Sequence, residues 1–287
     1  MGRDRHGKCF DHRKTWLVAR IKYLTEVFAI DVAAYAVMSN HYHLVLHVDQ
    51  SRAHAWSDEE VCRRWARLCT GPDELQRFIR GEVLNNIESE LLTSAIPRWR
   101  ALLCNLSRFM ACLNYVIALR ANKEDDCTGR FWEGRFKSQA LKDDAALLAC
   151  MAYVDLNPVR AGLAENLSDS EFTSIQDRIL RAKRKNPQHP APGLMPFAET
   201  SKDYDKRPMV PFSYRGYLVL VDWAGRIKHP NKRGVIKAKE PALLEKLGLS
   251  PEHWRRLELE IAKEASTMLN GLEFAERLSQ RTNKKVA

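Results

Sequence analysis

Residues 33–48 read Ala-Ala-Tyr-Ala-Val-Met-Ser-Asn-His-Tyr-His-Leu-Val-Leu-His-Val, and this stretch decides the fold. Apolar and aromatic residues lie on both sides of Ser39-Asn40, which is a turn signal. The pattern predicts two short strands, Val32 to Met38 and Tyr42 to Val48, joined at that turn.

Two histidines flank the start of the second predicted strand: His41 directly precedes it and His43 lies within it. Successive side chains on a strand point to opposite faces, so both imidazoles project to the same side. Two imidazoles in that arrangement can clamp a metal ion. The alternative is a pair of surface histidines at a strand start, and two ligands alone do not make a site.

The composition indicates which classes of partner and cellular compartment suit this protein. The 287 residues carry a formal net charge of +10, which favours a polyanionic partner, nucleic acid before an acidic membrane surface. No apolar run approaches the roughly 20 residues of a membrane helix, and Met1-Gly-Arg-Asp-Arg-His does not resemble a signal peptide. The seven cysteines form no C-x-x-C pair, a pattern typical of buried thiols in a reducing compartment. We expect a cytoplasmic protein with no membrane partner.

The sequences before and after the hairpin have apolar residues at helical spacing. This spacing predicts one helix from Asp11 or His12 to Ile30, which leads into the first strand. A mainly helical region follows from about Ser57 to Asn122, with Ser57 and Glu60 in the form of a capping box. Within it, Pro97 is expected to mark the start of a long helix.

Residues 128–141 read Thr-Gly-Arg-Phe-Trp-Glu-Gly-Arg-Phe-Lys-Ser-Gln-Ala-Leu and interleave aromatic with basic groups. We expect an extended segment, with a strand from about Arg135 to Leu141. Asp143 or Asp144 then caps a helix that runs to Asn157, where Pro158 ends it.

That helix presents an unusual face, on which small residues surround Tyr153. Tyr153 and Asn157 are four residues apart and therefore lie one above the other. The small neighbours leave room for a substrate strand. The alternative is a helix packed closely on a neighbour, with Tyr153 as a half-buried spacer.

The C-terminal part changes in composition. Residues 176–210 form a basic linker that contains prolines, and 211–287 form a smaller basic unit. Its run from Arg226 to Lys239 carries six Lys or Arg and no acid. We expect it to grip DNA, although a solvated basic face is the ordinary reading of such a run.

Three motifs occur in order: Met38-Ser-Asn-His-Tyr-His-Leu-Val-Leu46, Gly129-Arg-Phe-Trp-Glu-Gly-Arg-Phe136 and Tyr153-Val-Asp-Leu-Asn-Pro-Val-Arg-Ala-Gly-Leu163. Together they resemble the single-tyrosine transposases with a His-hydrophobic-His motif, in particular the REP-associated tyrosine transposases. The resemblance runs from about Asp11 to Leu163.

The resemblance implies an α+β fold, in which a ferredoxin-like or RRM-like antiparallel sheet is backed by helices. The catalytic domain would span 1–175, with a helical insertion at about 55–127, followed by the linker and a small, mainly helical C-terminal unit. Members normally begin with a strand before the first helix, and this chain starts where that strand would already have ended. Either another segment completes the sheet or the chain is truncated.

The resemblance also implies the chemistry. Tyr153 would be the nucleophile, and His41, His43 and Asn157 would hold Mg²⁺ or Mn²⁺. A tyrosine hydroxyl has a pKa of about 10 and needs help to attack. A hard cation can polarise the scissile phosphate. The products would be a 5′-phosphotyrosine and a free 3′-OH, and the reverse attack would rejoin the strand.

The expected partner is single-stranded or hairpin DNA, such as repetitive palindromic elements, in the nucleoid of a bacterium. Aromatic side chains would stack on bases while basic ones hold phosphates. The alternative is that Trp132 and Phe136 fill the core beneath the sheet. The residues expected to contact DNA are Arg130, Trp132, Arg135, Lys137, Lys232 and Arg233.

Two functions from different classes remain open. The first is a metal-dependent DNA transposase and single-strand endonuclease. The second is a non-catalytic DNA-binding protein descended from one, which the basic charge and the missing first strand favour. An RNA-binding module with the same sheet is a third, weaker alternative. The sequence leaves open whether the protein is a monomer or a homodimer.

Overall fold

A computed structural model describes residues 9–183, 193–198, 208–228 and 233–239. It divides into two compact units. The first unit holds the described residues of Met1–Lys14, Val32–Val45 and Lys137–Ala287. The second holds Thr15–Asp31 and Leu46–Phe136. The protein is of the mixed α+β class, as expected.

The element order begins with a helix and a hairpin, continues through five helices, and closes with three more in the described residues. The bounds are α1 (His12–Val27), β1 (Ile30–Val37), β2 (Tyr42–Val48), α2 (Gln50–Ala55), α3 (Asp58–Ala66), α4 (Asp73–Ile79), α5 (Asn86–Leu103), α6 (Leu106–Glu124), α7 (Asp144–Arg160), α8 (Ser174–Ala182) and α9 (Tyr214–Arg226).

The hairpin forms where the sequence predicts it. β2 has the predicted bounds, and β1 begins two residues before the predicted start. The turn closes through a backbone hydrogen bond from Met38 N–H to His41 O at 2.9 Å. β1 is buried along nearly its whole length, which explains why its side chains are apolar at successive positions rather than alternating.

In the first unit, the outer edge of β1 is closed without a further strand. Among the described residues the sheet contains only β1 and β2. Single bridges join Val32 to Leu194 and Ala36 to Thr173. The N–H of Val37 donates to Phe172 O at 3.0 Å. Later segments of the chain therefore occupy the outer edge of β1 in place of a further strand.

Side chains of α8 complete that closure. Ser174 Oγ accepts from the N–H of Tyr35 at 2.9 Å. The guanidinium of Arg178, which is buried, donates to Ala33 O at 2.9 Å. Since unpaired backbone groups are costly when buried, these bonds replace the ladder that a neighbouring strand would supply.

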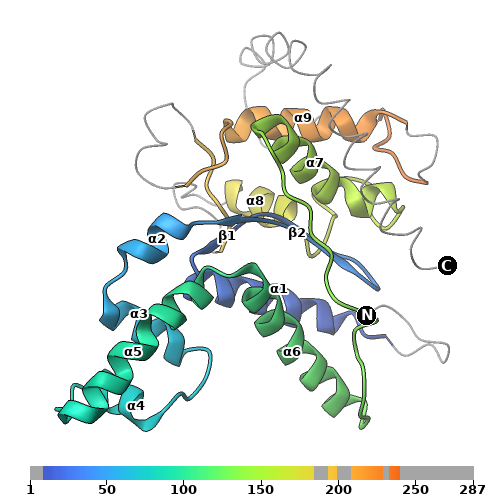
Figure 1. Ribbon diagram of the computed structural model, residues 1–287. Coiled ribbons are helices and arrows are strands. Elements are labelled where there is room, and N and C mark those ends of the chain that lie inside the picture. Colours follow the sequence, from blue (N-terminus) through green and yellow to red (C-terminus); the bar gives the residue numbers. More distant parts are fainter. Residues whose placement is uncertain (1–8, 184–192, 199–207, 229–232, 240–287) are drawn as a thin grey trace. The chain divides into compact units, whose positions relative to one another are not determined.

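In Figure 1, α7, α8 and α9 gather on one face of the hairpin. A carboxylate joins them: Asp155 in α7 is fully buried. It accepts hydrogen bonds from Ser174 Oγ, from Tyr217 Oη of α9, and from Ile175 N–H at 3.0 Å. Burial raises the pKa of Asp155 above its ordinary value, and the positive charge of Arg178 opposes the shift.

The C-terminal ends of α7 and α9 are also fastened together. Arg160 donates to the carbonyl oxygens of Ile227 at 2.6 Å and Ala224 at 2.7 Å, which satisfies groups left open at the end of α9. Gly234 N–H bonds Arg160 O at 3.2 Å. A Cβ at Gly234 would collide with the carbonyl oxygen of Val159, so only glycine allows this approach.

In the second unit, α3, α4 and α5 pack as a cluster, and α6 turns away from α5 by 81° (Figure 1). Ser57 caps α3 as expected, since its side chain accepts from Glu60 N–H at 3.2 Å. A capping box of Asn85 and Glu88 begins α5.

Several predicted elements differ from the structure. The first helix ends at Val27 rather than Ile30, which already begins β1. Pro97 lies inside α5 rather than at a helix start, because buried Leu92, Ile96 and Trp99 continue the apolar face past it. Pro158 lies inside α7, which ends at Arg160; a proline in the last turn removes only one donor, so the final residues stay helical. Residues 135–141 form no strand, since no described segment pairs with them and 137–140 are all exposed.

Within the described residues, no single helix has the length and apolar character to cross a membrane. α5 and α6 meet those criteria only when taken together, across their bend.

Removing the Asp155 carboxylate should loosen the first unit. Asp155→Ala leaves three buried donors without their acceptor, and each such loss costs about 1–3 kcal/mol. We expect the free energy of unfolding to fall by about 3 kcal/mol or more in urea titrations. Asp155→Asn keeps one acceptor oxygen and should lose less. Equal stability of Asp155→Ala and the wild type would contradict the role given to this network.

The raised pKa of Asp155 gives a pH dependence with a defined sign. The folded state favours the protonated carboxyl, so its contribution to stability is complete at low pH and is lost as pH rises through the raised pKa. Asparagine does not titrate. The stability of the wild type relative to Asp155→Asn should therefore fall as the pH rises above about 4, the ordinary pKa of an aspartate. A difference that does not change with pH would show that the shift is absent.

Candidate active site

The two histidines of the hairpin face each other at the start of β2. The ring centroids of His41 and His43 lie 4.9 Å apart with an interplanar angle of 83°. The predicted common side of the strand is thus confirmed by the ring contact. Nε2 of His43 is buried. Met38, which precedes the turn, is also buried.

A neighbour in the turn orients His41. Its Nδ1 lies 2.8 Å from Asn40 Oδ1, and because an amide oxygen only accepts, Nδ1 carries the proton. The lone pair then resides on Nε2, where a ligand or a proton can bind. Although His41 is exposed by area, surrounding protein displaces enough water to lower the pKa of its imidazole below the ordinary value. The neutral ring is the form that binds metals.

α7 brings Tyr153 to this pair. The ring centroids of His43 and Tyr153 lie 5.9 Å apart in an edge-to-face arrangement of 81°. Tyr153 is partly exposed and packs at the border of the core of the first unit. Asp143 begins the helix, accepting from Ala146 N–H at 2.7 Å, as expected. Residues that are far apart in sequence therefore meet as the resemblance implies.

Asn157 lies one turn after Tyr153 on the same face of α7 and is partly exposed. Among the described residues no group of three or more His, Cys, Asp or Glu is arranged to hold a metal ion. The predicted set therefore depends on the amide oxygen of Asn157 beside two imidazoles. The amide oxygen suits Mg²⁺ and Mn²⁺, whereas imidazole nitrogen is a donor that transition metals prefer, so this donor set fits Mn²⁺ better than Mg²⁺.

One residue that supports the site was not predicted from the sequence. Asp155 lies two positions after Tyr153 and fixes α7 to the rest of the unit. The sequence does contain a signal for this role: Asp155 stands between Val154 and Leu156, on a side of the helix that is otherwise apolar. A carboxylate in such a position is buried and needs hydrogen-bond partners.

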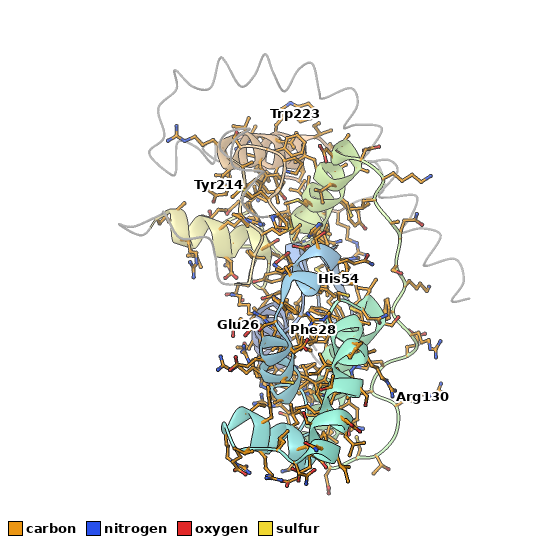
Figure 2. The ribbon with its side chains drawn as sticks, turned by 60° about the vertical axis from the view of Figure 1, so that its left-hand side comes forward. Glu26, Phe28, His54, Arg130, Tyr214 and Trp223 are labelled. Atoms are coloured by element: carbon orange, nitrogen blue, oxygen red, sulfur yellow. The ribbon has the colours of Figure 1, made fainter. Side chains whose placement is uncertain are left out.

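The predicted DNA-contacting residues lie in different settings. Arg130 and Arg135 are exposed, and Arg130 points away from the helices of its unit (Figure 2). Trp132 is partly buried, because its Nε1–H donates to Asn114 O of α6 at 2.9 Å and its ring packs edge-on against Phe131. These residues belong to the second unit, whereas the exposed Lys137 belongs to the first.

The basic C-terminal run is partly structural. Arg226 pairs with Asp222 within α9 at 2.9 Å. Ile236 is buried, and its N–H bonds Gly225 O at 2.9 Å. Arg233 is exposed, while Lys232 lies outside the described residues. The described part of this run is therefore docked on the same unit as α7, and its contact with DNA stays a prediction.

No family model, curated protein or solved structure matches the chain. The function of the protein therefore has to be inferred from the geometry of His41, His43 and Tyr153.

Substitution of either histidine should remove divalent-ion binding. We expect His41→Ala and His43→Ala to weaken the binding of Mn²⁺ at least tenfold in calorimetric titrations, and Asn157→Ala to weaken it less, because an amide oxygen is a modest ligand.

His47→Ala is the matched control. His47 is exposed on the same strand and lies 3.6 Å from Asp31, a carboxylate of the second unit. It should leave the titration unchanged. Equal Mn²⁺ affinity in the wild type and both site variants would mean that the histidine pair is a feature of the strand start and holds no metal.

Proposed function

We propose that this protein is a metal-dependent, single-tyrosine DNA transposase that cleaves and rejoins single-stranded or hairpin DNA. The observation that carries the proposal is the edge-to-face contact between Tyr153 and His43, beside His41. A hydroxyl nucleophile and two nitrogen ligands converge there from distant parts of the sequence. The proposal includes a ferredoxin-like sheet, of which the β1–β2 hairpin and its helical face are the coarse features.

The reaction balances with residues of this chain. Oη of Tyr153 attacks the phosphorus of a DNA phosphodiester, so a phosphorus–oxygen bond to tyrosine forms and the bond to the 3′ oxygen breaks. The hydroxyl proton leaves Tyr153, and the departing 3′ oxygen gains a proton. Because one ester replaces another, the reverse attack by a 3′-OH restores the strand without an external energy source.

His41, His43 and Asn157 are the residues that would hold the divalent ion. When bound, such an ion supplies Lewis-acid polarisation of the phosphate and stabilises charge on the leaving oxygen. The other residues position the reactive groups. Asn40 sets the tautomer of His41, and Asp155 anchors the helix that carries Tyr153.

A second function is favoured by a different observation. The net charge of +10 and the exposed Arg130 and Arg135 suit a protein that binds DNA without cutting it. In that case the contact of Tyr153 with His43 would be ordinary aromatic packing. The two functions differ in whether the tyrosine oxygen is needed.

Tyr153→Phe should abolish cleavage and leave DNA binding nearly intact, because it removes only the attacking oxygen. The measurement is a denaturing gel of protein incubated with end-labelled single-stranded DNA and Mn²⁺, which separates a covalent protein–DNA adduct from a fragment with a free 3′-OH.

Tyr115→Phe is the control, since Tyr115 is 67% exposed on α6 in the second unit. It should form the adduct at the wild-type rate. An undiminished adduct in Tyr153→Phe would exclude this tyrosine as the nucleophile, and no adduct in the wild type would leave the binding function as the better account.

A further inference from the structure

A hollow in the second unit is lined by residues other than the histidines and the tyrosine of the candidate site. Its volume is about 540 Å³, within the usual range for ligand pockets. It lies at the corner where α5 and α6 meet at 81°, and α3 supplies one wall. The lining residues are Trp65, Ser94, Ala95, Arg98, Trp99, Leu102 and Arg108.

Two tryptophans form a rigid apolar wall. The rings of Trp65 and Trp99 stack with centroids 5.6 Å apart and an interplanar angle of 10°. Each is only 7% exposed. On α5, the small residues Ser94 and Ala95 lie one turn before Arg98 and Trp99, so the helix leaves space beside the large side chains.

Two arginines give the hollow its charge, and none of its seven lining residues is acidic. Arg98 is exposed, and its side chain makes no ion pair or hydrogen bond with any described residue. The guanidinium carbon of Arg108 lies 5.4 Å from the centroid of Trp65, and its Nε is buried without a hydrogen-bond partner among the described residues. In contrast, Arg63, Arg64 and Arg100 nearby are paired with carboxylates.

We propose that this Trp–Arg hollow binds one nucleotide, with the phosphate held by Arg98 and Arg108 and the base against the tryptophan wall. Arginine provides the planar donors that phosphate oxygens accept, and aromatic walls bind unstacked bases with little sequence preference. The occupant is a nucleotide of single-stranded DNA, and a free nucleotide has the same chemistry. The assignment to DNA rests on the proposed function.

The test uses full-length protein carrying Tyr153→Phe, so that binding is read without strand cleavage. The probes are a fluorescein-labelled thymidine 12-mer, thymidine 5′-monophosphate, thymidine and inorganic phosphate. Arg98→Gln with Arg108→Gln removes the charge. Ala95→Phe fills the hollow and keeps both arginines. Arg63→Gln, on α3 outside the hollow and paired with Glu59, is the control for charge alone.

We expect both hollow variants to weaken binding of the 12-mer at least fivefold, and Arg63→Gln to leave it unchanged. The arginine variant should also flatten the log–log salt slope by about 0.7, the value for one phosphate contact on a single strand. Weakened binding of the 12-mer alone assigns the hollow to DNA. The hollow is assigned to a free nucleotide if the variants weaken binding of thymidine 5′-monophosphate alone. In that case thymidine and inorganic phosphate should each bind the protein more weakly than the mononucleotide does.

Unchanged binding of every probe in both hollow variants would overturn the proposal. An equal loss in Arg63→Gln would also overturn it, by showing a general effect of charge. Thermal melting followed by circular dichroism identifies a variant that fails to fold, in which case the other hollow variant decides. Because covalent adduct formation by the wild type is a separate measurement, failure here and failure of the proposed function are distinguishable.

Discussion

The first unit depends on one buried carboxylate. Asp155 accepts hydrogen bonds from residues that begin α8 and from a tyrosine of α9, while itself belonging to α7. Ser174 continues the connection to the backbone of β1 at Tyr35. Asp155 therefore joins three helices, and Ser174 links them to the strand that leads to the histidines. In a low-dielectric interior such a network stabilises one arrangement strongly, because each alternative leaves donors unsatisfied.

The same network sets the geometry of the candidate site. Tyr153 is two residues from Asp155 on α7, and His43 is on the strand paired with β1. The distance between their rings thus depends on interactions made elsewhere in the unit, in the way that reactive side chains are commonly held by supporting hydrogen bonds. Arg160 and Gly234 add a second attachment at the far end of the helix. The basic segment after α9 is consequently part of the support for α7.

Local patterns predicted the features that local physics determines. The hairpin, the caps at Ser57 and Asp143, and the shared face of the two histidines followed from alternation, turn chemistry and side-chain direction. The two proline boundaries were wrong because packing of an apolar face outweighs one missing hydrogen bond. The strand at 135–141 was wrong because a strand needs a partner, which composition does not reveal. The approach of Tyr153 to His43 came from the motifs and not from periodicity, and the role of Asp155 depends on partners from α8 and α9 that no local window contains.

Closure of the outer edge of β1 has a consequence for synthesis on the ribosome. The groups that satisfy this edge come from Phe172, Ser174, Arg178 and Met195, all of which are translated long after the hairpin. At about 5–20 residues per second, roughly 7 to 27 s pass between the appearance of Val37 and that of Phe172. During that time a buried, apolar strand has an open edge, the kind of surface that recruits other chains. We therefore expect the nascent hairpin to need protection from pairing with other chains until these residues emerge.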